Sequence, residues 1–535
     1  MCICMAKRST MKPMPFCKSD MMIKGNNPEN IRVGSTLSTD EFAGNTFDYM
    51  LSNPPYGKSW ASELKYIKDG KDIIDPRFQI QLTDYWNNAE DADATPRSSD
   101  GQLLFLMEMV NKMKPLTQSK MGSRIAYVHN GSSLFTGDAG GGESNIRRYI
   151  IENDWLEAIV QMPNNLFYNT GITTYIWILS NSKTGNRKGK VQLIDGGLLF
   201  QKLRKNLGAK NCEFAPAHIR EIVAVYSTMQ PVERNINPDT KDEEGIASKN
   251  FDNDDFGYYK VTIERPKRLK AKFTSERIAE LRFDKTLKEP MQWAYTEFGE
   301  EVYTDLAKHA KAIIEFTEKQ ELNLNAKQAN TLTNDALWKK QLDLLNAATE
   351  LMEAVGTDEY SDFNIFRQLV DAVCKDKAGL VSKISPSEKN AILNAVSWYD
   401  ATAEKVIKGT VKLTGDKLKE VLTRQDCTEA QLADHGYYPT GKKGEYLQNE
   451  TESDLRDTEN IPLKDNIYHY FLKEVKPHVP EAWINMEATK IGYEISFNKY
   501  FYRHKPLRSI EEVSTDILRL EEESDGLIRE ILKLT

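Results

Sequence analysis

The chain has 535 residues, a formal net charge of −8 at pH 7, 40% hydrophobic residues and 28% charged residues. The length predicts roughly two to four domains, and the composition is that of an ordinary globular protein. No apolar run of about 18 residues occurs, and residues 1–15 lack the apolar core of a secretory signal, so we expect no membrane contact. The acidic balance argues against a stand-alone DNA-binding protein, because such proteins usually carry a basic surplus.

The six cysteines are scattered, and Cys2 and Cys4 form the only close pair. This usage predicts free thiols in a reducing compartment, and we therefore expect a cytoplasmic protein. No second Cys or His pair stands at zinc-binding spacing, so we predict no metal site.

The front half of the chain alternates short apolar runs with helical patterns. Strands are predicted at 47–55, 123–130, 155–163, 174–181 and 190–196, with a helix over Gln102–Lys114. This alternation predicts an α/β domain with a largely parallel sheet. The polar stretch 231–255 is interpreted as a linker or surface loop, and 256–266 as one more strand.

Residues 266–430 are rich in Ala, Leu, Lys and Glu, and we predict a helical domain there. A C-terminal region, 431–535, follows. Ser509 and Glu512 form a capping-box pattern that starts a helix over 509–535. Seven of its apolar residues follow coiled-coil spacing: Ile510, Val513, Ile517, Leu520, Leu527, Ile531 and Leu534. This helix packs either on its own domain or against the coiled coil of a partner, and the pattern favours neither.

The strongest chemical signal is the tetrapeptide Asn53-Pro54-Pro55-Tyr56, which follows an apolar strand. Ligands of open α/β sheets bind at the carboxyl ends of strands. The amine of adenine is a poor nucleophile, because its lone pair is delocalised into the ring. Two acceptors for its N–H groups would free that lone pair, and the Asn53 side-chain oxygen and the Pro54 carbonyl suit this role.

The two prolines restrict φ and stiffen this loop. Tyr56 offers a ring on which a base flipped out of the duplex can stack. The alternative is an ordinary proline-rich turn after a strand, and the position of the motif favours the catalytic interpretation.

The tetrapeptide resembles the catalytic motif of adenine-specific DNA amino-methyltransferases. Longer segments resemble the modification subunits of type I restriction-modification systems: NIRVGSTLSTDEFAGNTFDYMLSNPPYGKSW, AYVHNGSSLFTGDAGGGESNIRRYIIENDWLEAIVQMPNNLFYNTGITTYIWILSN and TKIGYEISFNKYFYRHKPLRSIEEV. The likeness covers most of 16–265 and the chain from about 450 onwards.

The resemblance implies methyl transfer from S-adenosylmethionine to adenine N6 in DNA. It implies a specificity subunit, a second modification subunit and a restriction subunit as partners. It places Phe167 in a loop beside the flipped base, where core packing is the alternative. It also places Ser35 and Thr36 in a turn that contacts the cofactor, where the family often has an acidic residue.

The family's glycine-rich cofactor turn has no counterpart before Asn53. We therefore expect a shortened chain with an atypical segment at 1–15 and a partial methyltransferase domain at 16–265. The predicted fold class is an incomplete Rossmann-like sheet, a helical domain and a C-terminal coiled-coil-like helix. The expected activity is impaired in the chain alone. The alternatives are a degenerate scaffold that assembles without transferring methyl groups, or a methyltransferase acting on a small-molecule or protein amine.

Overall fold

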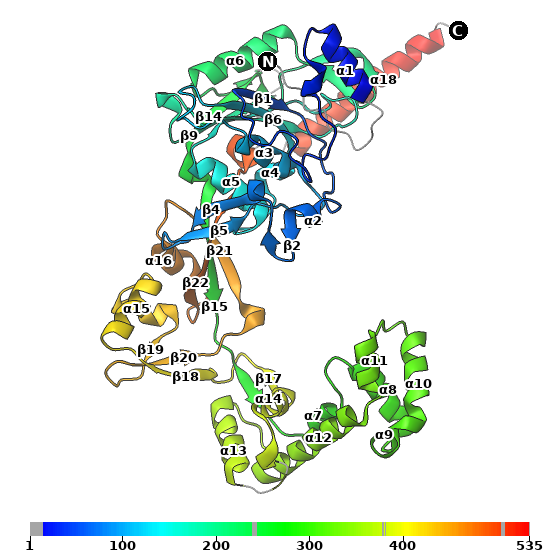
Figure 1. Ribbon diagram of the computed structural model, residues 1–535, viewed down its shortest axis with the longest axis vertical. Coiled ribbons are helices and arrows are strands. Elements are labelled where there is room, and N and C mark those ends of the chain that lie inside the picture. The colour runs from blue at the N-terminus through cyan, green and yellow to red at the C-terminus, as the bar shows by residue number, and fades with distance from the viewer. Residues whose placement is uncertain (1–13, 238–242, 377–378, 380, 504–508, 534–535) are drawn as a thin grey trace. The chain divides into compact units, whose positions relative to one another are not determined.

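The computed structural model describes residues 14–237, 243–376, 379, 381–503 and 509–533 (Figure 1). The chain forms two units. Unit 1 contains Met1–Tyr258, Pro462–Lys464 and Ile491–Thr535, and unit 2 contains Tyr259–Ile461 and Asp465–Lys490. The predicted boundaries at 265 and 430 differ from this division, because the last segment of the chain returns to unit 1.

Unit 1 is built on a six-stranded mixed sheet with the order β1-β6-β8-β7-β9-β14. Its strands are β1 (Tyr49–Ser52), β6 (Arg124–Asn130), β7 (Leu156–Gln161), β8 (Thr174–Ser180), β9 (Lys190–Asp195) and β14 (Ala247–Asp252). β1 pairs with β6 and β7 pairs with β9 in parallel, whereas β8 and β14 run antiparallel to their neighbours. The predicted α/β class is confirmed, with two antiparallel strands in a sheet that was expected to be largely parallel.

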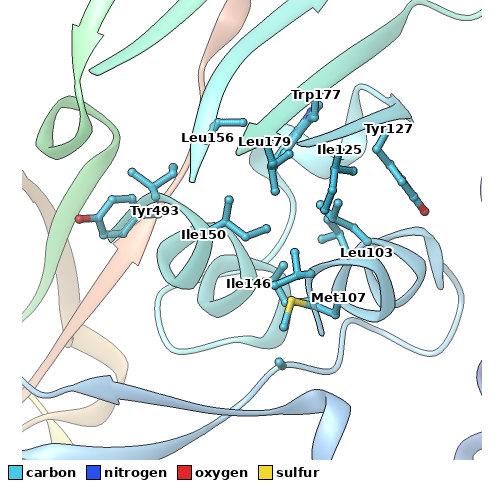
Figure 2. Close-up of a cluster of buried hydrophobic side chains, with 14 of the residues drawn as sticks. Leu103, Met107, Ile125, Tyr127, Ile146, Ile150, Leu156, Trp177, Leu179 and Tyr493 are labelled. Carbon is cyan, nitrogen blue, oxygen red and sulfur yellow. The ribbon is translucent and has the colours of Figure 1, made fainter. Parts of the chain in front are cut away.

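Alternate residues of β8 pack into two different hydrophobic clusters, because successive side chains of a strand point to opposite faces of the sheet. Trp177 and Leu179 join helices α3 (Gln102–Asn111) and α5 (Gly142–Glu152) in the larger cluster, as Figure 2 shows. Ile176 and Ile178 face the smaller cluster with α6 (Pro216–Thr228). Helices therefore cover both faces of the sheet, and this explains why five consecutive residues of β7 are buried.

β1 lies at one edge of this sheet, and two of its apolar side chains are solvent-exposed. Tyr49 is 75% exposed and Leu51 is 84% exposed. Strands with parallel pairing are usually covered on both faces. Among the described residues, no strand pairs with the outer side of β1, so this edge presents backbone groups and apolar surface.

The predicted linker at 231–255 is wrong in its second half, because β14 forms there and pairs with β9. The strand is polar because an antiparallel edge strand faces solvent on one side. The remaining strands and helices of unit 1 are α1 (Met14–Ile23), α2 (Leu64–Ile67), β2 (Lys68–Asp69), β3 (Asp72–Ile73), β4 (Gln79–Thr83), β5 (Ala89–Asp93), α4 (Ser132–Phe135), β10 (Gln201–Leu207), β11 (Lys210–Glu213), β12 (Asn235–Ile236), β13 (Glu243–Glu244), α17 (Phe497–Phe501) and α18 (Ile510–Lys533).

Unit 2 contains the predicted helices: α7 (Ser275–Ala279), α8 (Lys288–Phe298), α9 (Glu301–Thr304), α10 (Leu306–Lys319), α11 (Ala326–Leu332), α12 (Asp335–Val355), α13 (Phe363–Asp376), α14 (Pro386–Ala395), α15 (Asp416–Arg424) and α16 (Ile467–Tyr470). The long helix α12 contributes Trp338 to one hydrophobic cluster and Leu344 to another.

Most elements within 266–430, the range predicted as a helical domain, are helices, and three short strands, β16, β17 and β18, also lie there. The strands outside unit 1 are β15 (Gly257–Glu264), β16 (Leu269–Ala271), β17 (Ser397–Tyr399), β18 (Ile407–Lys412), β19 (Tyr438–Pro439), β20 (Glu445–Asn449), β21 (Asp457–Pro462) and β22 (Trp483–Tyr493). Three of them, β15, β21 and β22, lie only partly outside unit 1, because each crosses the boundary between the units. β18 alternates half-buried and exposed residues, which is the period of a strand.

The predicted C-terminal helix forms as α18, directly after Ser509. Its apolar residues Ile510, Ile517 and Leu520 are 85%, 59% and 58% exposed. The side chains of Leu527 and Ile531 and the whole of Leu534 lie outside the described residues. Within the described part of the chain, no helix is both long and apolar enough to cross a membrane.

Candidate active site

The carboxyl ends of β1, β6, β7 and β9 meet at one edge of the unit 1 sheet. β8 runs antiparallel to both β6 and β7, so these two strands share one direction, and β1 and β9 are parallel to them. The loops that follow these four strands begin at Asn53, Gly131, Met162 and Gly196. This is the edge at which open α/β sheets bind ligands.

The predicted catalytic tetrapeptide begins directly after β1. Pro54 is buried, Asn53 and Pro55 are exposed, and Tyr56 is half-buried. The Tyr56 hydroxyl donates a hydrogen bond to Asn53 Oδ1. Burial raises the pKa of Tyr56 to about 12, so this hydroxyl keeps its proton at neutral pH. The bond fixes the orientation of the Asn53 amide at the open end of the strand.

The predicted cofactor turn at Ser35 and Thr36 lies beside a buried arginine. Arg77 is 7% exposed, and its Nη1 donates to Thr36 O at 2.7 Å and to Glu108 Oε2 at 2.8 Å. Ser35 Oγ donates to Glu63 Oε1 at 3.3 Å. The structure thus brings a carboxylate to the turn that lacks one in its own sequence. Sequence reasoning missed Glu63, because it lies 28 residues away from Ser35 along the chain.

The segment after the tetrapeptide is anchored to the start of α3 through Trp60. This side chain is 2% exposed, and its Nε1 donates to Arg97 O at 3.0 Å. Trp60 N donates to Ser98 O at 2.9 Å, and Gly101 N donates to Lys58 O at 3.0 Å. These bonds connect the loop that follows the candidate tetrapeptide to the N-terminus of α3.

Gln102 is the centre of a polar network at the same edge of the sheet. It is 2% exposed, and its Nε2 lies 2.7 Å from Asp100 Oδ2, 2.7 Å from Asn130 Oδ1 and 2.9 Å from Ser132 Oγ. A buried amide of this kind is costly to leave unpaired, so the network fixes the loops after β6 and before α3. Sequence reasoning missed it, because Gln102 was interpreted only as the first residue of a helix.

His129 extends this network into the core. It is fully buried, its Nδ1 lies 3.1 Å from Gln102 Oε1, and its Nε2 has no hydrogen-bond partner. Because that Oε1 also accepts from Asn130 N, it is the amide oxygen, and Nδ1 of His129 is the donor to it. A proton on Nε2 would have no partner, which favours the neutral ring. Burial lowers the pKa of His129 from 6.5 to about 3.

We expect the free energy of unfolding to fall as pH drops from about 6.5 towards 3. In this window His129 is protonated in the unfolded chain and neutral in the folded chain, so the free energy of unfolding falls by up to about 1.4 kcal/mol per pH unit. His129→Gln retains a donor for Gln102 and removes the titration, so its stability should depend less on pH. Urea unfolding of both proteins at several pH values down to about 4 measures this, and identical pH dependences would contradict it.

The predicted stacking residue Phe167 lies in the loop after β7 and is half-buried. Its neighbour Tyr168 is 60% exposed. β7 is three places from β1 in the sheet, about 14 Å at ordinary strand spacing. In the described part of the chain the structure joins Tyr56 to Asn53 and Ser35 to Glu63, and it shows no direct bond from Phe167 to these groups.

Comparison with known proteins shows which proteins this part of the chain is similar to. Residues 6–266 match the family model described as N-6 DNA Methylase. The Type I restriction enzyme MjaIX methylase subunit of Methanocaldococcus jannaschii is 28% identical over 214 residues, which are 39% of this chain and 33% of the relative. The EcoKI methylase subunit of Escherichia coli is 22% identical over 198 residues, 37% of this chain and 31% of that protein. The chain spans about a third of the length of the curated relatives it matches.

Among solved structures, the type I restriction-modification methyltransferase subunit of Streptococcus thermophilus aligns with a TM-score of 0.35 and 21% identity, over 47% of this chain and 45% of that one. The EcoKI M protein aligns with a TM-score of 0.29 and 17% identity, over 46% and 50%. The sequence matches confirm the resemblance found in the sequence. Residues 6–266 match the N-6 DNA methylase family model, and up to about 40% of the chain is similar to the methylase subunits of type I restriction enzymes.

Proposed function

We propose that the chain transfers a methyl group from S-adenosylmethionine to N6 of an adenine flipped out of DNA. The observation that carries the proposal is the position of Asn53 and Pro54 at the carboxyl end of β1, with the Tyr56 ring beside them. Asn53 is exposed, so its side chain is free to meet a ligand.

The local geometry suits an aromatic amine as substrate. A carbonyl oxygen has two lone pairs, so Asn53 Oδ1 can accept from the Tyr56 hydroxyl and still accept from an amine. The Pro54 carbonyl supplies the second acceptor, and the two N–H bonds are then held so that the nitrogen lone pair points to one side. Tyr56 offers a ring for stacking, which offsets roughly 1–3 kcal/mol of lost base stacking. Phe167 is the second candidate for base contact.

S-adenosylmethionine fits the groups at the Ser35–Thr36 turn. The Ser35 hydroxyl and the Glu63 carboxylate suit the hydroxyl and amino groups of this cofactor. When bound, the cofactor supplies an electrophilic methyl group on a sulfonium. Arg77 positions the turn by holding the Thr36 carbonyl, and Glu63 links it to the loop that follows Tyr56.

We further propose that the chain on its own is a weak methyltransferase. In the described part of the chain, no strand of the main sheet precedes β1 in sequence, and the β1 edge is open. The described residues therefore form only part of a cofactor site, since the family's glycine-rich turn is not among them.

The proposed partners are DNA, a specificity subunit, a second modification subunit and a restriction subunit. The exposed apolar residues of α18 support subunit assembly, because a helix with Ile510, Ile517 and Leu520 in water gains stability by pairing. The net charge of −8 also supports a partner that contributes to the binding of DNA phosphates, because an acidic chain attracts them weakly as a whole.

Tritiated S-adenosylmethionine tests the proposal in a mixture of the full chain, the specificity subunit of its own system and target DNA. The expected result is label on adenine N6 that depends on all three components. Assembly of the complex without label would favour the scaffold alternative. Label on protein or on small amines would favour the other class of methyltransferase.

A further inference from the structure

The hairpin β10–β11 follows β9 and leaves the sheet at the same edge as the candidate active site. Gln201–Leu207 and Lys210–Glu213 pair antiparallel, and the short turn between them contains Gly208 with φ +66°. Lys202, Arg204 and Lys205 are all exposed on this hairpin. Three positive side chains thus lie within four consecutive residues.

These three cations are free of carboxylate partners. Within the described residues, no hydrogen bond or ion pair engages the side chains of Lys202, Arg204 or Lys205. The hairpin as a whole is therefore a concentrated positive element on an acidic protein of net charge −8. Because these three side chains form no ion pairs within the described residues, their charges are available to attract anions.

The hairpin is also joined to the loop that carries Phe167 and Tyr168. Ala209 N donates to Tyr168 O at 2.9 Å, Asn211 N donates to Asn165 O at 3.1 Å, and Lys210 Nζ donates to Leu166 O at 3.0 Å. A Cβ on Gly208 would come within 2.7 Å of Tyr168 O, so the close approach requires glycine. These bonds make the hairpin and the loop one structural element.

The spacing along the sheet edge suits a nucleic acid. β7 and β9 lie three and four places from β1, about 14 and 19 Å at ordinary strand spacing. A duplex carries one negative charge per ~1.7 Å of its axis, so a duplex with one base at Asn53 has phosphates within reach of cations at this distance. The exposed ring of Tyr168, in the loop after β7, adds a stacking surface between Asn53 and the hairpin.

We propose that the hairpin β10–β11 binds the phosphate backbone of target DNA beside the extruded adenine, through Lys202, Arg204 and Lys205. The inference rests on the proposed function for its choice of DNA as ligand. Its contacts are independent of base sequence, because cations on phosphates position a duplex and do not specify it.

The test is DNA binding by the full chain and by the triple variant Lys202→Gln, Arg204→Gln, Lys205→Gln, with a 25-base-pair duplex as probe over a range of salt concentrations. The variant should bind roughly tenfold or more weakly, and the slope of log affinity against log salt should fall by about 0.9 for each lost phosphate contact, roughly 2–3 in total. The loss should be the same for duplexes of different sequence.

The matched control is Lys120→Gln, Lys188→Gln, Lys190→Gln, which removes the same charge from exposed residues at the amino ends of β6 and β9. This control should retain the wild-type slope.

Equal slopes for wild type and hairpin variant, or an equal loss in the control, would overturn the inference. So would a full chain that fails to bind the duplex at low salt, or a hairpin variant that loses only its affinity for a protein partner. The Asn53→Ala variant distinguishes this inference from the proposed function, because it should bind DNA with the wild-type slope. If no methyl transfer is detected but the hairpin variant loses its slope, the phosphate contact stands and the proposed chemistry fails.

Discussion

Replacing Asn53 with alanine is expected to lower methyl transfer by roughly a hundred- to a thousandfold, the effect of removing one precisely placed hydrogen-bonding group from an active site. The substitution leaves the Pro54 carbonyl and the Tyr56 ring in place, so a base can still bind but its amine is held at one point only. The turnover number should therefore fall much more than the affinity for DNA. Single-turnover methyl transfer at saturating DNA measures the effect.

The same variant should retain its fold, because Asn53 is exposed and lies at the end of a strand. The half-buried Tyr56 hydroxyl loses its partner, at a cost of about 1 kcal/mol or less. The matched control is Asn186→Ala, since Asn186 is also exposed and its Oδ1 also accepts from a nearby hydroxyl, Thr184 Oγ1 at 2.9 Å. Full activity in the Asn53 variant, or loss of its folded state, would contradict the assigned role.

The sequence predicts those parts of unit 1 in which a local pattern decides the structure. The central strands β6, β7, β8 and β9 are rich in apolar residues, and the position of Asn53 follows from the end of β1. The edge strand β14 is not predicted, because it is largely polar and an edge strand that faces solvent on one side needs no continuous apolar run. Periodicity is therefore a good guide in the centre of this sheet and a poor one at its margin.

The sequence could not predict contacts that join distant segments. Glu63 reaches Ser35, and Gln102 joins Asn130 and Ser132, only because the loops at the sheet edge converge after folding. The local sequence pattern of a segment does not indicate which distant residues its side chains will contact. The candidate catalytic residues could therefore be named from the sequence, whereas the groups that hold them in place could not.

The largest expected effect on stability comes from Arg147, a buried residue of α5 that joins two such segments. It is 0% exposed, and its guanidinium donates to Tyr493 O at 2.6 Å, Thr136 O at 2.8 Å and Ser133 O at 3.0 Å. Burial lowers its pKa to about 10, so it remains charged at neutral pH. In the described part of the chain it has no ion-pair partner, and its hydrogen bonds go to backbone carbonyls, while the carboxylates of Glu143 and Glu494 stabilise its charge from a greater distance.

We expect Arg147→Met to lower the free energy of unfolding by about 3–5 kcal/mol. Methionine fills most of the volume but removes the guanidinium donors of the Ser133, Thr136 and Tyr493 carbonyls, at about 1–3 kcal/mol for each buried carbonyl before relaxation. Tyr493 O keeps the long bond from Ser144 Oγ at 3.4 Å. Tyr493 keeps its N–H bond to Ser144 Oγ at 2.9 Å, so the strand should loosen without detaching.

Urea unfolding measures the loss, and hydrogen exchange should show faster opening of the backbone around Thr136 and Tyr493 than elsewhere in unit 1. Arg220→Met, at an exposed position of α6, is the control and should change stability by less than about 0.5 kcal/mol. An equally small change in the Arg147 variant would mean that water satisfies these carbonyls, and that the attachment of the C-terminal segment depends on apolar packing of Tyr493 instead.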